Sequence, residues 1–109
     1  MKAVYPVIFT QTDTVVLVEV PDLEILTEGK DLQDAIEMAR DAIGLTGISM
    51  QDHGESIPEP SDYHKIKFDE GTFAKDGEGQ ISLVDIDFDV YRRKVDVKTV
   101  RRNVQLADR

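Results

Sequence analysis

Three aspartates, Asp85, Asp87 and Asp89, occupy every second position in a late segment of the chain. Four apolar residues alternate with them: Val84, Ile86, Phe88 and Val90. Successive side chains of a β-strand point to opposite faces, so the alternation predicts a half-buried strand over residues 80–93 with an acidic outer face. Such a row of carboxylates could bind a metal ion or dock a basic partner.

The metal interpretation would make the protein a metal-dependent nuclease-like enzyme. Carboxylates on one face of a strand are about 7 Å apart, however, which exceeds the ~3.5–4 Å that separates the ions of a two-metal site. Acids from other segments are not visibly aligned with the three aspartates. We therefore expect no metal site here, and docking of a basic partner is the functional alternative to a plain solvated acidic face.

Other catalytic signatures are missing from the sequence. There is no cysteine, and the two histidines, His53 and His64, have no partner at metal-ligand spacing. Neither a Ser or Cys nucleophile signature nor a glycine-rich phosphate loop occurs. We expect no catalytic residue, no cofactor and no enzymatic activity.

Charge is distributed unevenly along the 109 residues, whose formal net charge is −9. Residues 92–109 hold seven Lys or Arg and two Asp, a net of +5, whereas residues 1–91 hold six basic and twenty acidic groups, a net of −14. An acidic body disfavours nucleic acid and favours a basic partner, while the basic end favours nucleic acid. With no signal peptide or membrane-length apolar run, a cytoplasmic protein is expected.

Three strands are predicted in the first part of the chain, at Lys2–Thr10, Val15–Val20 and Leu23–Thr27. Their alternating apolar residues and short connections indicate an antiparallel meander. Pro6 lacks a backbone donor, which places the first strand at a sheet edge or places Pro6 where its missing N–H would point outward.

A long amphipathic helix is predicted at Leu32–Asp52, because apolar residues recur at three- and four-residue steps after Asp31, a good N-cap. Gly44 and Gly47 each weaken a helix interior by up to about 1 kcal/mol, yet the periodicity continues through them. We expect four helix residues to be buried against four strand residues: Leu32, Ile36, Ala39 and Ile43 against Val16, Val18, Ile86 and Phe88.

The segment after the helix contains two prolines in residues 55–62 and is predicted to be extended. A polar, glycine-containing excursion follows at residues 63–79, with a short strand expected at Ile66–Phe68. A strand-strand-strand-helix-strand order predicts an α+β fold, an antiparallel β-β-β-α-β sheet with one main helix packed on one face.

Several segments, in this order and spacing over about residues 4–94, resemble the N-terminal domain of HicB-type antitoxins. They are YPVIF and VVLVEVPDL (within Tyr5–Leu23), Thr27 and Gly29, KDLQDAIEMARDAI (Lys30–Ile43), GESIPEPS (Gly54–Ser61) and VDIDFDVYRRK (Val84–Lys94). The resemblance implies a partial ribonuclease-H-like fold. It also implies an antitoxin that neutralises HicA, a small basic toxin that cleaves messenger RNA, that regulates its own transcription and that forms homo-oligomers.

The C-terminal end departs from the family. KTVRRNVQL (Lys98–Leu106) resembles the first strand of a ribbon-helix-helix domain, in which Arg101, Asn103 and Gln105 would face DNA. Both helices of such a domain are missing, so we expect either a shortened piece of a longer protein or a natural shortened copy. The expected division is an antitoxin domain at residues 1–94 and a basic tail at residues 95–109.

The main hypothesis from the sequence is therefore an antitoxin whose acidic face, Asp85, Asp87 and Asp89, meets a HicA-like toxin. The alternatives are a DNA-binding transcriptional regulator without a cognate toxin and the metal-dependent enzyme considered above. Operator DNA would be bound only through a complete C-terminal domain.

Overall fold

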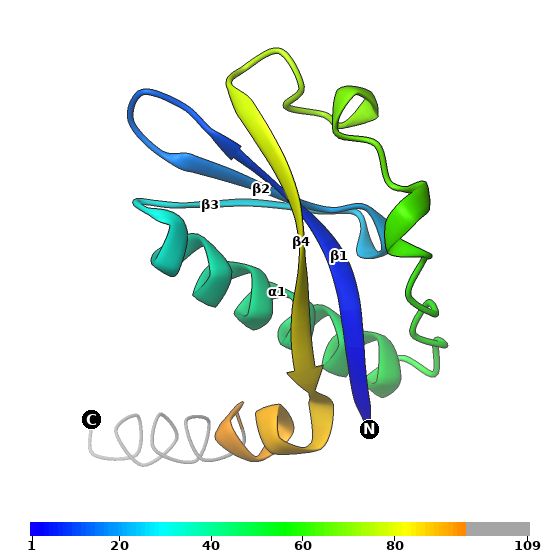
Figure 1. The fold of residues 1–109 in the computed structure, drawn as a ribbon. Coiled ribbons are helices and arrows are strands. Elements are labelled where there is room, and N and C mark those ends of the chain that lie inside the picture. Colours follow the sequence, from blue (N-terminus) through cyan, green and yellow to red (C-terminus); the bar gives the residue numbers. More distant parts are fainter. Residues whose placement is uncertain (96–109) are drawn as a thin grey trace, which may run out of the picture.

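The computed structural model describes residues 1–95, and it shows an α+β fold in which one long helix lies along one face of an antiparallel sheet (Figure 1). The four strands are β1 (Lys2–Gln11), β2 (Val16–Val20), β3 (Ile25–Gly29) and β4 (Glu78–Asp87). Their order in the sheet is β3-β2-β1-β4, and every neighbouring pair is antiparallel. The predicted fold class is confirmed.

The third strand begins two residues later than predicted. Pro21–Leu23 form a single 3-10 turn (η1), and Glu24 follows with φ 55°, in the left-handed region. The proline fixes its own φ and cannot extend the β2 ladder, so the chain turns before it can pair again. The predicted meander is thereby kept, with a tighter corner than the sequence suggests.

Pro6 lies in a central strand but loses no sheet hydrogen bond. β1 pairs with β4 along its whole length, from Lys2 to Gln11, whereas its pairing with β2 starts only at Ile8. Backbone groups of alternate strand residues point to opposite neighbours. The N–H of Phe88 donates to the carbonyl of Met1, so the odd residues of β1 bond toward β4 and Pro6 faces the side where β2 is missing.

The helix α1 spans Leu32–Asp52, as predicted, and begins with a reciprocal cap. The carboxylate of Asp31 accepts from the N–H of Asp34 at 2.8 Å, and that of Asp34 accepts from the N–H of Lys30 at 2.9 Å. These bonds satisfy backbone donors that a helix start leaves free. Among the described residues, no helix is long and apolar enough to cross a membrane.

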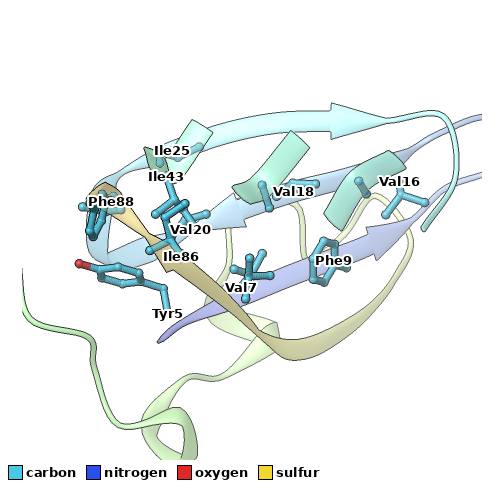
Figure 2. Close-up of a cluster of buried hydrophobic side chains, with 14 residues drawn as sticks. Tyr5, Val7, Phe9, Val16, Val18, Val20, Ile25, Ile43, Ile86 and Phe88 are labelled. Carbon is cyan, nitrogen blue, oxygen red and sulfur yellow. The ribbon is translucent and has the colours of Figure 1, made fainter. Parts of the chain in front are cut away.

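The core lies between α1 and the sheet (Figure 2). Most of the expected contacts are confirmed, since Ala39, Ile43, Val16, Val18, Ile86 and Phe88 are all buried. The prediction for Leu32 is wrong: its side chain is 52% exposed, because the buried stripe begins at Ala35 and continues through Ala39 and Ile43. Ile36 packs at the margin of the core and is partly buried.

The connection between α1 and β4 crosses the molecule without forming a strand. Residues 55–62 form neither a helix nor a strand, and the Tyr5 hydroxyl donates to the carbonyl of Pro58 at 2.7 Å. The strand predicted at Ile66–Phe68 is wrong: the chain forms two 3-10 turns, η2 (Tyr63–Lys65) and η3 (Phe68–Glu70). Asp62 caps η2 through the N–H of His64, and this local bond competes with an extended chain.

The strand predicted over residues 80–93 is too long. β4 ends at Asp87, and residues 88–95 are helical up to the end of the described chain. Val90 therefore does not continue the inner face of the sheet, and its side chain is 38% exposed. Phe88 still reaches the core, but it does so from the first turn of this second helix.

Candidate functional site

The three aspartates do not form the predicted acidic ladder, because the chain changes from strand to helix among them. Asp85 lies on β4 and is held by Arg40 of α1. The guanidinium donates from Nη2 to the carboxylate at 3.0 Å and from Nε to the Asp85 backbone carbonyl at 3.0 Å. The bond from Arg40 to the carboxylate is the main cause that lowers the pKa of Asp85 below its ordinary value, followed by the backbone N–H of Asp85 itself and the positive charge of Arg40.

Asp87 is the N-cap of the second helix. Its Oδ1 accepts from the N–H of Val90 at 3.2 Å and from that of Asp89 at 3.0 Å. The bond from Val90 is the main reason that the pKa of Asp87 is lowered, since hydrogen bonds to a carboxylate favour its charged form. The same cap explains why the strand stops at this residue.

Asp89 is in the first turn of the second helix, where its carboxylate pairs with the N-terminal amine of Met1. A negative side chain also complements the positive end of a helix dipole. Each aspartate thus has a different partner within the chain. Among residues 1–95, no group of three or more His, Cys, Asp or Glu side chains is placed to hold a metal ion.

The carboxylates remain open to solvent despite these partners. The side chains of Asp85 and Asp89 are 77% and 69% exposed. They border an apolar surface, since Val4 pairs with Asp85 across the sheet and is itself 48% exposed. The residues predicted to dock a partner are accessible, and their role in docking stays a prediction.

The second helix packs against α1 at two glycines, Gly44 and Gly47. A Cβ on Gly47 would overlap the ring of Phe88, and a Cβ on Gly44 would lie 2.6 Å from the ring of Tyr91. From helix propensity alone, both glycines are expected only to weaken α1. One sequence feature could have predicted these contacts: the two glycines are three residues apart, and so are Phe88 and Tyr91. This spacing places the two glycines on one face of α1 and the two rings on one face of the second helix.

Polar contacts fix the same helix in place. The Tyr91 hydroxyl donates to the Asp41 carboxylate, and Arg92 Nη2 donates to Asp52 at 3.0 Å and to Gln51 at 3.1 Å. Burial, and then the bond to Asp41, raise the pKa of Tyr91. The first basic residue of the C-terminal segment is therefore attached to the end of α1.

The residues predicted to face DNA, Arg101, Asn103 and Gln105, lie outside the described residues. The two histidines have local contacts: His53 Nδ1 lies 2.7 Å from the Ser49 carbonyl, and the His64 ring packs edge-on against Tyr63. One hollow of about 180 Å³ is lined by residues that include Ile8, Glu19 and Lys65.

The sequence matches a family model described as "HicB_like antitoxin of bacterial toxin-antitoxin system" over residues 5–109. No curated protein matches the chain.

Two solved structures are similar in fold. A chain of the "Toxin-Antitoxin complex from Streptococcus pneumoniae" has a TM-score of 0.72 and 24% identity, over 84% of this chain and 73% of that chain. A chain of the "HicA3 and HicB3 toxin-antitoxin complex" has a TM-score of 0.62 and 23% identity, over 77% of this chain and 98% of that chain. At these identities the similarity supports a common fold.

Proposed function

The chain belongs to the HicB-like antitoxin family of bacterial toxin–antitoxin systems, and from this premise we propose that it binds and neutralises a HicA-like toxin. The family match over residues 5–109 is the observation that carries the proposal. The two structures of similar fold come from toxin–antitoxin complexes, which supports a toxin as the partner.

The charge of the chain supports a basic partner. Residues 1–91 have a net charge of −14, and most of their carboxylates lie on the surface. Opposite charges on two proteins raise the rate of encounter, and the effect weakens with added salt. Neutralisation by binding alone requires no catalytic residue in the antitoxin, so we propose that the protein has no enzymatic activity and acts in the cytoplasm.

A toxicity assay tests this function. The proposed function predicts a gene for a small basic protein next to the gene of this chain, and that protein should arrest growth and cleave messenger RNA when it is expressed alone. Co-expression of this chain should restore growth, and the two proteins should purify together. Toxicity that persists at equal expression, with no complex on a sizing column, would overturn the proposal.

Transcriptional autoregulation is the second part of the proposal, for the full-length form of the protein. The seven Lys and Arg residues among residues 92–109 support it, because basic side chains bind DNA through its phosphates. The alternative, a DNA-binding regulator without a toxin, predicts operator binding but no toxin complex. Binding of the chain to its own promoter DNA at increasing salt concentrations, with and without the toxin, separates the two.

A further inference from the structure

β4 is an edge strand whose outer side has no strand partner among residues 1–95. Its residues 79–84, GQISLV, contain neither a charged residue nor a proline. Natural sheets usually protect an exposed edge with charges, prolines or bulges, because unpaired backbone groups attract other strands. An uncharged stretch of six residues on an open edge is therefore a candidate for strand addition.

The hydrogen bonds show which backbone groups face outward. The N–H of Phe88 donates to the Met1 carbonyl at 2.9 Å, so Phe88 and every second residue before it bond toward β1. The intervening residues then point their N–H and C=O away from the sheet: Gly79, Ile81, Leu83 and Asp85. The contact of Arg40 Nε with the Asp85 carbonyl agrees with this alternation, since Arg40 approaches from α1.

Arg40 also limits the length of the open edge. Its Nε donates to the outward-facing carbonyl of Asp85. The outward-facing backbone N–H and C=O groups of Ile81 and Leu83 therefore form the centre of the open edge. The side chains of these two residues lie on the face opposite α1. Leu83 is 51% exposed there, and Val4 is 48% exposed on the same face of the neighbouring strand. A strand added at this edge would gain backbone bonds and apolar contact together.

The charges around the edge of β4 favour the addition of a basic strand. Acids flank the uncharged stretch on both sides, Asp76 and Glu78 before it and Asp85 and Asp87 after it. Two copies of β4 paired antiparallel would bring the acidic end of one strand toward the acidic start of the other. A strand with basic residues at its ends would instead be attracted at both places.

We propose that the open edge of β4, centred on Ile81 and Leu83, receives an extended strand of the basic partner protein. The proposal rests on the proposed function for the partner's identity, and it adds the surface and the mode of binding. Backbone pairing at residues 79–84 supplies affinity, and the flanking acids select a basic strand.

Amide hydrogen exchange tests the mode of binding directly, with the toxin from the neighbouring gene as the probe. In the free chain the amides of Ile81 and Leu83 should exchange fast, while those of Ser82 and Val84, which bond to β1, should be protected. In the complex all four should be protected. Fast exchange at Ile81 and Leu83 in a saturated complex would overturn the proposal.

Variants test the same edge by affinity. Ile81→Pro removes one outward N–H without removing a bond to β1, and should weaken toxin binding about tenfold or more. Leu83→Lys places a positive charge where a basic strand would lie and should weaken binding at least as much. Leu26→Lys is the matched control, since Leu26 is 55% exposed on the same face but on the other edge strand. Equal affinities for the Leu83 and Leu26 variants would overturn the edge assignment.

The outcomes separate this inference from the proposed function. If the parent chain binds no toxin, the proposed function fails. If the parent binds but the edge variants and the exchange pattern are unchanged, only the edge inference fails. A free chain that is dimeric, with protected Ile81 and Leu83 amides, would replace the basic partner by a second copy.

Discussion

The ring of Phe88 lies against the backbone of Gly47, so closely that a Cβ on Gly47 would overlap Cε1 and lie 2.8 Å from Cδ1. Alanine normally stabilises a helix interior by about 1 kcal/mol relative to glycine. Here we expect the opposite sign, because Phe88 is 1% exposed and its ring has no free space into which to move. Chemical denaturation should show that Gly47→Ala lowers the free energy of unfolding.

The control for this prediction is Gly47→Ala in a variant that lacks the Phe88 ring. In a Phe88→Ala background, Gly47→Ala should stabilise the protein by roughly the usual 1 kcal/mol. A stabilising Gly47→Ala in the parent chain would show that the second helix does not dock as described.

Phe88→Ala alone should lower the free energy of unfolding by about 3–5 kcal/mol, the usual range for emptying a buried aromatic site. The ring lies in the core with Ile43 and Ile86, although it comes from a helix and not from a strand. Urea titration measures the change. A loss below about 1 kcal/mol would mean that the ring is not buried in solution.

The cap at Asp87 predicts a pH dependence of stability. Its pKa is lower in the folded chain than in the unfolded one, so the stabilisation is complete above the unfolded pKa near 4 and is lost as the pH falls through the folded pKa. Thermal melts from pH 5 down to pH 2 should therefore show a smaller loss for Asp87→Asn, which keeps a capping oxygen but does not titrate. Asp87→Ala should also lower the melting temperature at pH 7. Identical pH profiles for the parent and Asp87→Asn would exclude the cap as the cause.

Replacing Asp85, Asp87 and Asp89 together by asparagine should slow association with the toxin and remove most of the salt dependence of that rate. The reason is the loss of three negative charges from the side that borders the proposed edge. Stopped-flow association at increasing salt measures both effects. Three exposed acids can be changed to glutamine as a control of equal charge: Glu24 after η1, Glu28 on β3 and Glu37 on α1. Equal rates for the parent and the aspartate variant at low salt would mean that the docking face lies elsewhere.

Two tyrosines predict a loss of stability in alkaline solution. Burial is the main cause that raises the pKa of both Tyr5 and Tyr91, with nearby carboxylates adding to it. Their contribution to stability is complete below the unfolded pKa near 10 and is lost as the pH rises toward the folded values. Unfolding between pH 9 and 11 should become less pH-dependent in Tyr5→Phe and Tyr91→Phe. Tyr63→Phe, at a side chain that is 42% exposed, is the control.

The elements that follow from local periodicity were predicted well from the sequence. The bounds of α1 and its cap at Asp31 are confirmed, because the 3.6-residue period and the capping residue both lie within that segment. The early strands are confirmed within two residues, and so is their antiparallel order. One stripe residue, Leu32, was predicted to be buried, whereas it is 52% exposed.

The end of β4 could not be predicted from alternation alone. Phe88 continues the two-residue period of a strand, but it also starts the three-residue spacing that pairs with Tyr91 in a helix. The cap by Asp87 favours the helix over a continued strand, and this cap forms only where the backbone turns. The contact between Arg40 and Asp85 joins residues that are 45 positions apart, so no local pattern contains it.

The pairing of β1 with β4 also determines when the domain can form during synthesis. Lys2 is opposite Asp87, so the longest ladder of the sheet joins the first strand of the described chain to its last strand. While the ribosome is still translating, β1 has β2 on one side only, and the apolar face of α1 lacks Ile86 and Phe88. Non-local pairing of this kind slows folding. The nascent antitoxin must therefore wait for residues 78–88 to leave the exit tunnel, and until then its unfinished sheet is exposed to proteases and to other nascent chains.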